Sequence, residues 1–173
     1  MNSVGIDVSK GRSTVTVMRP FGEVVISPFE VRHTDSELSA LARLLKSLDG
    51  ETRVVMEATG NYHTPVAKVL HDARLYVSVV HAKLIHGYGN NDLRRVKTDR
   101  KDAVKLANYG LNRWLTLPRY FPEEDTRLLL KNCYRQYKQY SKVQTVLKNN
   151  LISLLDTVFP NVNRLFNGST MPL

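Results

Sequence analysis

The first third of the chain has a strand-like alternation of apolar and polar side chains. Residues 3–9 and 12–18 alternate or run apolar on either side of Gly11, which predicts a β-hairpin. Residues 23–31 predict a third strand, and Pro28 within it predicts either that this strand lies at a sheet edge or that it ends near Pro28.

Helix-like and strand-like patterns then alternate up to about residue 114. We predict a helix that starts at a Thr34 or Asp35 cap and buries leucines at helical spacing, namely Leu38, Leu41, Leu45 and Leu48. We also predict strands over 53–57 and 75–80, and helices over 62–72 and from a Thr98 cap to about Trp114. The segment from His81 to Val96 is ambiguous, and a loop is predicted only around Gly87, Gly89, Asn90 and Asn91. This order predicts an α/β fold, a mixed sheet with flanking helices, over residues 1–116.

A second unit is predicted over residues 122–159, after two prolines that interrupt helical structure. Its apolar positions step alternately by three and four residues: Leu130, Cys133, Tyr137, Tyr140, Gln144, Leu147, Leu151, Leu154 and Val158. Such a seam predicts a long coiled-coil helix that pairs with another helix. It also makes helix packing a better prediction than base stacking for Tyr137 and Tyr140. The tail, 160–173, has too few apolar residues to form a domain.

The net charge of the chain indicates which kind of partner it binds. The formal net charge is +9, which favours association with polyanions, chiefly nucleic acid. No apolar run approaches the roughly 20 residues needed to span a bilayer, and the single cysteine, Cys133, fits a reducing compartment. We therefore expect a cytoplasmic protein that binds nucleic acid and not membrane. The basic residues expected to contact nucleic acid are Lys10, Arg94, Arg95, Lys97, Arg100, Lys101, Lys105, Arg127, Lys131, Arg135 and Lys138.

Four acidic residues stand out against this positive background. Asp7 and Glu57 end two predicted strands, and Asp99 and Asp102 lie three residues apart in the first turn of a predicted helix. At a separation of about 4 Å and an effective dielectric constant of about 20, two carboxylates repel by about 4 kcal/mol unless a cation or proton lies between them. Carboxylates from separate elements could therefore supply a site for hard divalent cations beside a phosphate-binding surface. Taken singly, each acid has a simpler interpretation as a turn former or a helix cap.

Three motifs occur together along the chain: Gly5 to Lys10 (GIDVSK), Met56 to Tyr62 (MEATGNY) and Lys97 to Ala103 (KTDRKDA). In this order and spacing they resemble the DEDD transposases, the insertion-sequence family that includes the pilin-gene invertase and the bridge-RNA-guided recombinases. The segment His81 to Lys83 and the basic helix after Phe121-Pro122 are also similar to parts of that family.

The resemblance implies a RuvC-like domain of the ribonuclease H type over residues 1–116. It implies that Asp7, Glu57, Asp99 and Asp102 form a catalytic tetrad that binds Mg²⁺ or Mn²⁺. It further implies DNA as substrate, a structured guide RNA as a second partner, and dimers or tetramers formed through the coiled coil. Family members also carry a C-terminal domain with a nucleophilic serine, to which the tail 160–173 would lead, so we expect this chain alone to be an incomplete recombinase.

Two other functions fit parts of the sequence. The chain could be a nucleic-acid-binding and oligomerisation module in which the acids are structural. It could also be an actin-like ATPase or sugar kinase, because the segment Gly5 to Ser9 followed by a hairpin resembles the first phosphate loop of that superfamily. Against this, Lys10 follows where those loops favour small residues, and no second phosphate loop is seen.

Overall fold

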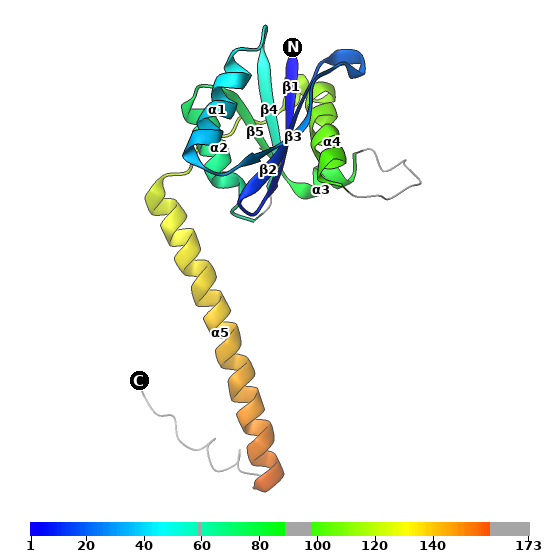
Figure 1. Cartoon of the computed structure of the whole chain (residues 1–173). Helices are drawn as coiled ribbons and strands as arrows, with labels where there is room; N and C mark the ends of the chain where they lie inside the picture. The colour runs from blue at the N-terminus through cyan, green and yellow to red at the C-terminus, as the bar shows by residue number, and fades with distance from the viewer. Residues whose placement is uncertain (59, 89–97, 160–173) are drawn as a thin grey trace. The chain divides into compact units, whose positions relative to one another are not determined.

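The computed structural model of the chain describes residues 1–58, 60–88 and 98–159 (Figure 1). They divide into two compact units, the first ending at Pro122 and the second beginning at Glu123. The first unit contains a sheet of five strands, and the second contains one long helix.

The sheet of the first unit is mixed, with the strand order β3-β2-β1-β4-β5. The strands are β1 (Asn2–Ser9), β2 (Arg12–Met18), β3 (Val24–Arg32), β4 (Thr52–Glu57) and β5 (Tyr76–Val80). β1, β2 and β3 pair antiparallel, whereas β4 and β5 run parallel to β1. The predicted hairpin and all five predicted strands are confirmed, and β3, which contains Pro28, lies at the sheet edge, the first of the two alternatives predicted for it.

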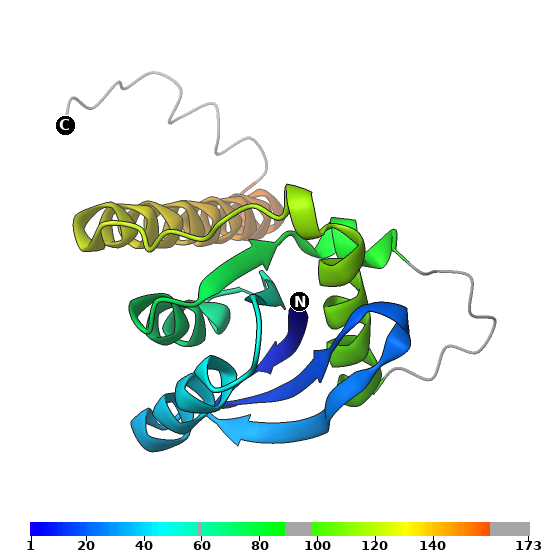
Figure 2. The ribbon, with the colours of Figure 1, turned by 90° about the horizontal axis from the view of Figure 1, so that it is seen from above.

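Helices cover both faces of this sheet (Figure 2). α1 (Asp35–Lys46) and α2 (His63–Asp72) lie on one face, and α4 (Asp99–Asn112) lies on the other. All three were predicted, and the hydroxyls of Thr34 and Thr98 cap α1 and α4 by accepting hydrogen bonds from the backbone N–H groups of Glu37 and Lys101. The short helix α3 (Ala82–His86) and two 3₁₀ turns, Pro20–Gly22 and Trp114–Thr116, were not predicted.

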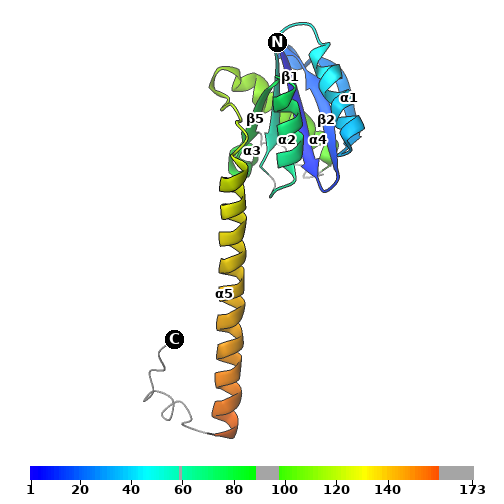
Figure 3. The same cartoon turned by 90° about the vertical axis from the view of Figure 1, so that its left-hand side faces the viewer.

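The hydrophobic core has one layer on each face of the sheet. The larger layer packs Val4, Ile6 and Val8 of β1 against the leucines of α1 and α2. Figure 3 shows these two helices beside the sheet. The smaller layer joins Val55 and Val80 to Leu106 and Tyr109 of α4. These two layers hold the sheet between the helices, so the ends of β1 and β4 have fixed neighbours.

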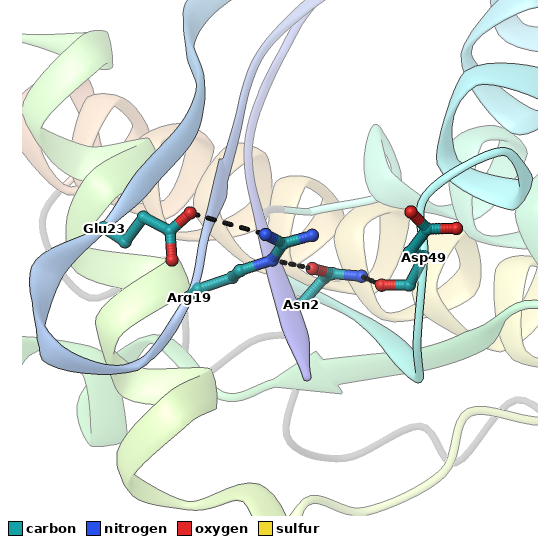
Figure 4. A network of polar contacts seen from close by, with 4 residues as sticks. All are labelled: Asn2, Arg19, Glu23 and Asp49. Atoms are coloured by element: carbon teal, nitrogen blue, oxygen red, sulfur yellow. Dashed lines mark hydrogen bonds and ion pairs between the residues drawn. The ribbon is translucent and has the colours of Figure 1, made fainter.

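A network of polar contacts ties together the N-terminal end of the sheet (Figure 4). The side chain of Asn2, which is fully buried, accepts a hydrogen bond from Arg19 Nε at 2.9 Å and donates one to the Asp49 carbonyl at 2.9 Å. Arg19 also forms an ion pair with Glu23 at 3.4 Å. The network therefore braces the start of β1 against the β2–β3 connection and the loop before β4, at the end of β1 opposite Asp7.

Residues 117–122 belong to the first unit and pack against strand β5. Tyr76 Oη donates a hydrogen bond to the Leu117 carbonyl at 2.7 Å, and the Tyr120 N–H donates one to the Val77 carbonyl at 2.8 Å. The first unit therefore extends beyond the predicted helix end near Trp114.

The second unit contains α5 (Asp125–Val158), a single helix of 34 residues (Figure 3). The predicted helix is confirmed, whereas its pairing as a coiled coil stays a prediction. At its start Lys131 Nζ hydrogen-bonds Glu123 and lowers the pKa of that carboxyl. No helix among the described residues is both long and hydrophobic enough to cross a membrane.

Candidate functional site

Asp7 and Glu57 lie side by side at the carboxyl ends of two neighbouring parallel strands. Ile6 of β1 pairs with Met56 of β4, and the two acids are the next residue in each strand. Neighbouring strands lie about 4.8 Å apart, and side chains alternate between the two faces of a sheet. Asp7 therefore shares a face with Gly5, and Glu57 shares that face with Val55, the residue paired with Gly5. Both acids are half-buried.

Helix α4 lies directly on this face because the residues between helix and sheet are small. The Ser3 hydroxyl donates a hydrogen bond to the Ala107 carbonyl of α4 at 2.7 Å. A Cβ atom added to Gly5 would overlap the Ala103 carbonyl oxygen and lie 2.5 Å from the Ala107 nitrogen. The backbones of β1 and α4 are therefore in contact at Gly5.

The direction of α4 brings its first turn to the end of the sheet where Asp7 and Glu57 lie. Ser3 contacts the helix at Ala107, and Gly5, further along β1, contacts it at both Ala103 and Ala107. The next residue of β1 on this face is Asp7, and the next turn of α4 toward its start holds Asp99 and Asp102.

Asp99 and Asp102 lie on the same side of α4 as its buried residues. Asp99 precedes Ala103 by four residues, and Asp102 precedes Leu106 by four, so each lies above a residue that is at most 1% exposed. Strand register and helix direction thus bring all four acids to one end of one face of the sheet.

The four side chains do not close into a compact group. Among the described residues no three His, Cys, Asp or Glu side chains lie close enough to hold one metal ion. Asp99 lines a cleft of about 420 Å³ with Thr14 and Glu30, and Asp102 lines another, of about 750 Å³, with Tyr88 and Lys105. The donors match Mg²⁺ or Mn²⁺ in type, since all are carboxylate oxygens, but they are spread over the end of the sheet.

A fifth acid, Glu30, lies at the same end of the sheet and was not predicted. Thr14 of β2 pairs with Asp7, and Glu30 of β3 pairs with Thr14, so the three side chains share a face. Glu30 also forms an exposed ion pair with Arg12 at 3.7 Å. The pairing register of β3 is the signal that would have identified it.

The predicted basic residues fall into three groups. Arg100, Lys101 and Lys105 line the larger cleft beside Asp102, and Lys10 is exposed in the turn that directly follows β1. Four others are exposed on α5 in the second unit, where Lys131 contacts Glu123: Arg127, Lys131, Arg135 and Lys138. Arg94, Arg95 and Lys97 lie outside the described residues.

Comparison with known families decides the class of the chain. The family model of the IS110-type DEDD transposases, described as a transposase, matches residues 4–160. The chain belongs to this transposase family. The sheet order and the helix pair on one face, with a single helix on the other, are those of the ribonuclease H-like fold that the sequence resemblance implied.

Two individual proteins are similar to part of this chain. Pilin gene-inverting proteins of Moraxella bovis and Moraxella lacunata are each 30% identical to it over 89 residues, or 51% of the chain. The matched segment is 27% of the length of each of these relatives.

Among solved structures, Thermus thermophilus RuvC in complex with a Holliday junction substrate matches 69% of the chain and 99% of its own length, with 12% identity and a TM-score of 0.49. A second Thermus thermophilus RuvC structure matches with 15% identity and a TM-score of 0.45, over 69% of the chain and all of its own length.

Proposed function

We propose that this chain is the RuvC-like catalytic part of a DNA transposase or site-specific recombinase, and that Asp7, Glu57, Asp99 and Asp102 hold its divalent metal ions. The observation that carries the proposal is the arrival of four carboxylates, from β1, β4 and α4, at one end of one sheet face. Membership of a transposase family supports DNA as the substrate.

The chemistry of such a site follows from the charges of its residues. When bound, Mg²⁺ or Mn²⁺ would polarise a phosphodiester and stabilise the charge that develops on its attacking and leaving oxygens. The carboxylates of this chain would hold the ions, and neutralising their charge removes the repulsion that keeps them apart.

The basic residues of the site would hold the nucleic acid in place. Arg100, Lys101 and Lys105, which line the cleft beside Asp102, would contact the phosphates on either side of the reacting one. Lys10 would add a phosphate contact from the turn after β1.

Two further partners belong to the proposal. A structured guide RNA would be a second polyanion for the basic surface, in keeping with the net charge of +9. The exposed apolar stripe of α5 supports a homo-oligomer formed through this helix.

The decisive experiment compares strand exchange by the full-length transposase and by two variants, Asp7→Asn and Asp102→Asn. Each variant removes a charge that the ions require, so we expect a loss of at least about 100-fold in rate, with unchanged thermal unfolding. Asp72→Asn is the matched control, because Asp72 lies at the end of α2 and pairs with His71 on the surface. Full activity in both site variants would contradict the proposal.

A second candidate is a non-catalytic nucleic-acid-binding and oligomerisation module. The spread of the acids over two clefts favours it. In that case DNA binding would be the same with and without Mg²⁺, and Asp7→Asn would leave it unchanged. DNA binding that Mg²⁺ strengthens in the wild type but not in Asp7→Asn would exclude this candidate.

A further inference from the structure

α5 carries an apolar stripe that no described part of the second unit covers. Nine residues make up the stripe: Leu130, Cys133, Tyr137, Tyr140, Gln144, Leu147, Leu151, Leu154 and Val158. Tyr140 is 69% exposed and Leu154 is 67% exposed. An isolated helix with this pattern gains most of its stability from a partner helix.

We propose that the partner is a second copy of α5 that runs antiparallel, in the register that places Tyr140 opposite Gln144 of the second copy and Leu130 opposite Leu154. This inference rests on the oligomer included in the proposed function and adds its orientation and register. The register overlaps the helix from end to end, because Thr126 then faces Val158 of the second copy.

Side-chain sizes in the seam favour the antiparallel orientation. In a parallel pair each seam residue meets its own copy, so Tyr137 and Tyr140 form two successive crowded layers, whereas Cys133 forms a layer too small to fill. In the antiparallel register Tyr137 meets Leu147 and Cys133 meets Leu151, so these layers combine a larger with a smaller side chain. The phenol of Tyr140 and the amide of Gln144 can hydrogen-bond each other.

In the same register, residues that flank the seam on one helix face residues of similar polarity on the second copy. Gln136 comes opposite Asn150 of the second copy, and Val143 comes opposite Val143 near the two-fold axis. Lys148 comes opposite the ring of Tyr134, a favourable cation–π pair. A parallel pair would instead set Val143 against Lys148 and Asn150 against Leu155.

The charge distribution agrees with the antiparallel orientation. Four basic residues lie in the N-terminal half of α5 and a fifth, Lys142, lies just past its midpoint; none of the five is a seam position: Arg127, Lys131, Arg135, Lys138 and Lys142. A parallel pair would bring both sets to the same end, where they repel each other. The antiparallel pair places the four basic residues of each N-terminal half at opposite ends of the pair and leaves them facing solvent, where nucleic acid can reach them.

Native Cys133 allows a direct test with the 173-residue chain. In the proposed pair the two Cys133 residues are about 27 Å apart along the helix axis, from a rise of about 1.5 Å per residue. Copper–phenanthroline oxidation should therefore leave the wild-type dimer without an intermolecular disulfide. In Leu151→Cys the new thiol lies opposite Cys133, and we expect most of the protein to become a disulfide-linked dimer.

Matched variants make the result decisive. Adding Cys133→Ala to Leu151→Cys should abolish the cross-link, and the triple variant Cys133→Ala, Leu130→Cys, Leu154→Cys should restore it at another layer of the seam. A disulfide between wild-type Cys133 residues would overturn the proposal, as would a chain that sediments at 19.7 kDa at tens of micromolar. The cross-link depends on α5 alone, so loss of metal or DNA binding would leave this result unchanged.

Discussion

At the scale of single residues, the position of α4 depends on very small residues between it and the sheet. Gly5 and Gly110 lie where strand and helix backbones meet, and a Cβ atom added to Gly110 would lie 2.8 Å from Val55 Cγ2. Ser3, which lies against Gly110, contributes a hydrogen bond to the same helix. Because Asp99 and Asp102 are on that helix, these small residues determine where two of the four acids lie.

We expect Gly5→Ala to destabilise the first unit by about 3 kcal/mol, because the added methyl group meets main-chain atoms that cannot rotate away. Urea unfolding measures the change. Gly87→Ala is the control, since its Cβ would lie 3.6 Å from the nearest atom, an ordinary contact. Equal stability of the two variants would contradict the close contact of β1 and α4.

His33 predicts a pH dependence of stability. Its Nε2 lies 2.8 Å from the Ser13 hydroxyl, and burial lowers its pKa below the ordinary value of 6.5. Because the unfolded chain takes up a proton near pH 6.5 and the folded chain does so only at lower pH, stability falls as the pH drops below about 6.5. The decrease stops once the pH is below the pKa of the folded state.

Urea unfolding at pH 7.5 and 5.5 tests this expectation. His33→Gln should lose less stability between these two pH values than the wild type does. The same pH dependence in wild type and His33→Gln would contradict the prediction.

The sequence predicted the positions of Asp7 and Glu57 for a physical reason. Both acids follow an apolar run: Glu57 is the last residue of β4, and Asp7 lies two residues before the end of β1. Parallel neighbours bring their carboxyl ends to one edge. The contact at Gly5 was not predictable in the same way, because it depends on which helix crosses β1 and at what distance. Glu30 was missed because its role depends on the register of β3, which has two irregularities between Val15 and Met18 of its partner strand.

At the scale of elements, one arginine joins the sheet to the segment that follows α4. The guanidinium of Arg53 on β4 lies between the rings of Tyr76 and Trp114, 4.5 Å from each ring centre. It also forms an ion pair with Glu51 at 2.7 Å and donates a hydrogen bond to the Trp114 carbonyl. The Arg53 guanidinium therefore holds the segment after α4 both by stacking on Trp114 and by a hydrogen bond to its carbonyl.

Arg53→Lys should destabilise the first unit by about 1–2 kcal/mol, because an ammonium keeps the charge but not the planar stacking. Arg12→Lys is the matched control, since the ion pair of Arg12 with Glu30 is exposed and should matter by less than about 0.5 kcal/mol. Thermal unfolding followed by circular dichroism measures both. Equal midpoints for the two variants would show that the stacked guanidinium contributes nothing specific.

Long periodic elements were predictable and short ones were not. The leucines of α1 and the alternation in β1 and β2 each extend over at least seven residues, enough to show a period. α3 has only five residues and follows β5 after a single residue, His81, whose side chain caps it. Its sequence has too few turns to show a helical period, so the pattern of residues 81–96 was ambiguous and this helix was not predicted.

At the scale of the whole molecule, positive charge occurs on both units. In the first unit it borders the acids at the end of the sheet, and in the second it follows the outer side of α5. A net charge of +9 on 173 residues would make nucleic-acid binding strongly salt-dependent, since each phosphate contact releases a counterion. The acids are then the feature that distinguishes a catalytic site from a binding surface.

Calorimetric titration of the chain with Mn²⁺, with and without duplex DNA, tests that distinction most directly. We predict saturable binding in the wild type and in the surface control Asp72→Asn, and its loss in Asp7→Asn and in Asp102→Asn. Mn²⁺ binding of the same strength and stoichiometry in all four proteins, or no binding by the wild type even with DNA present, would contradict the assignment of these acids to a metal site.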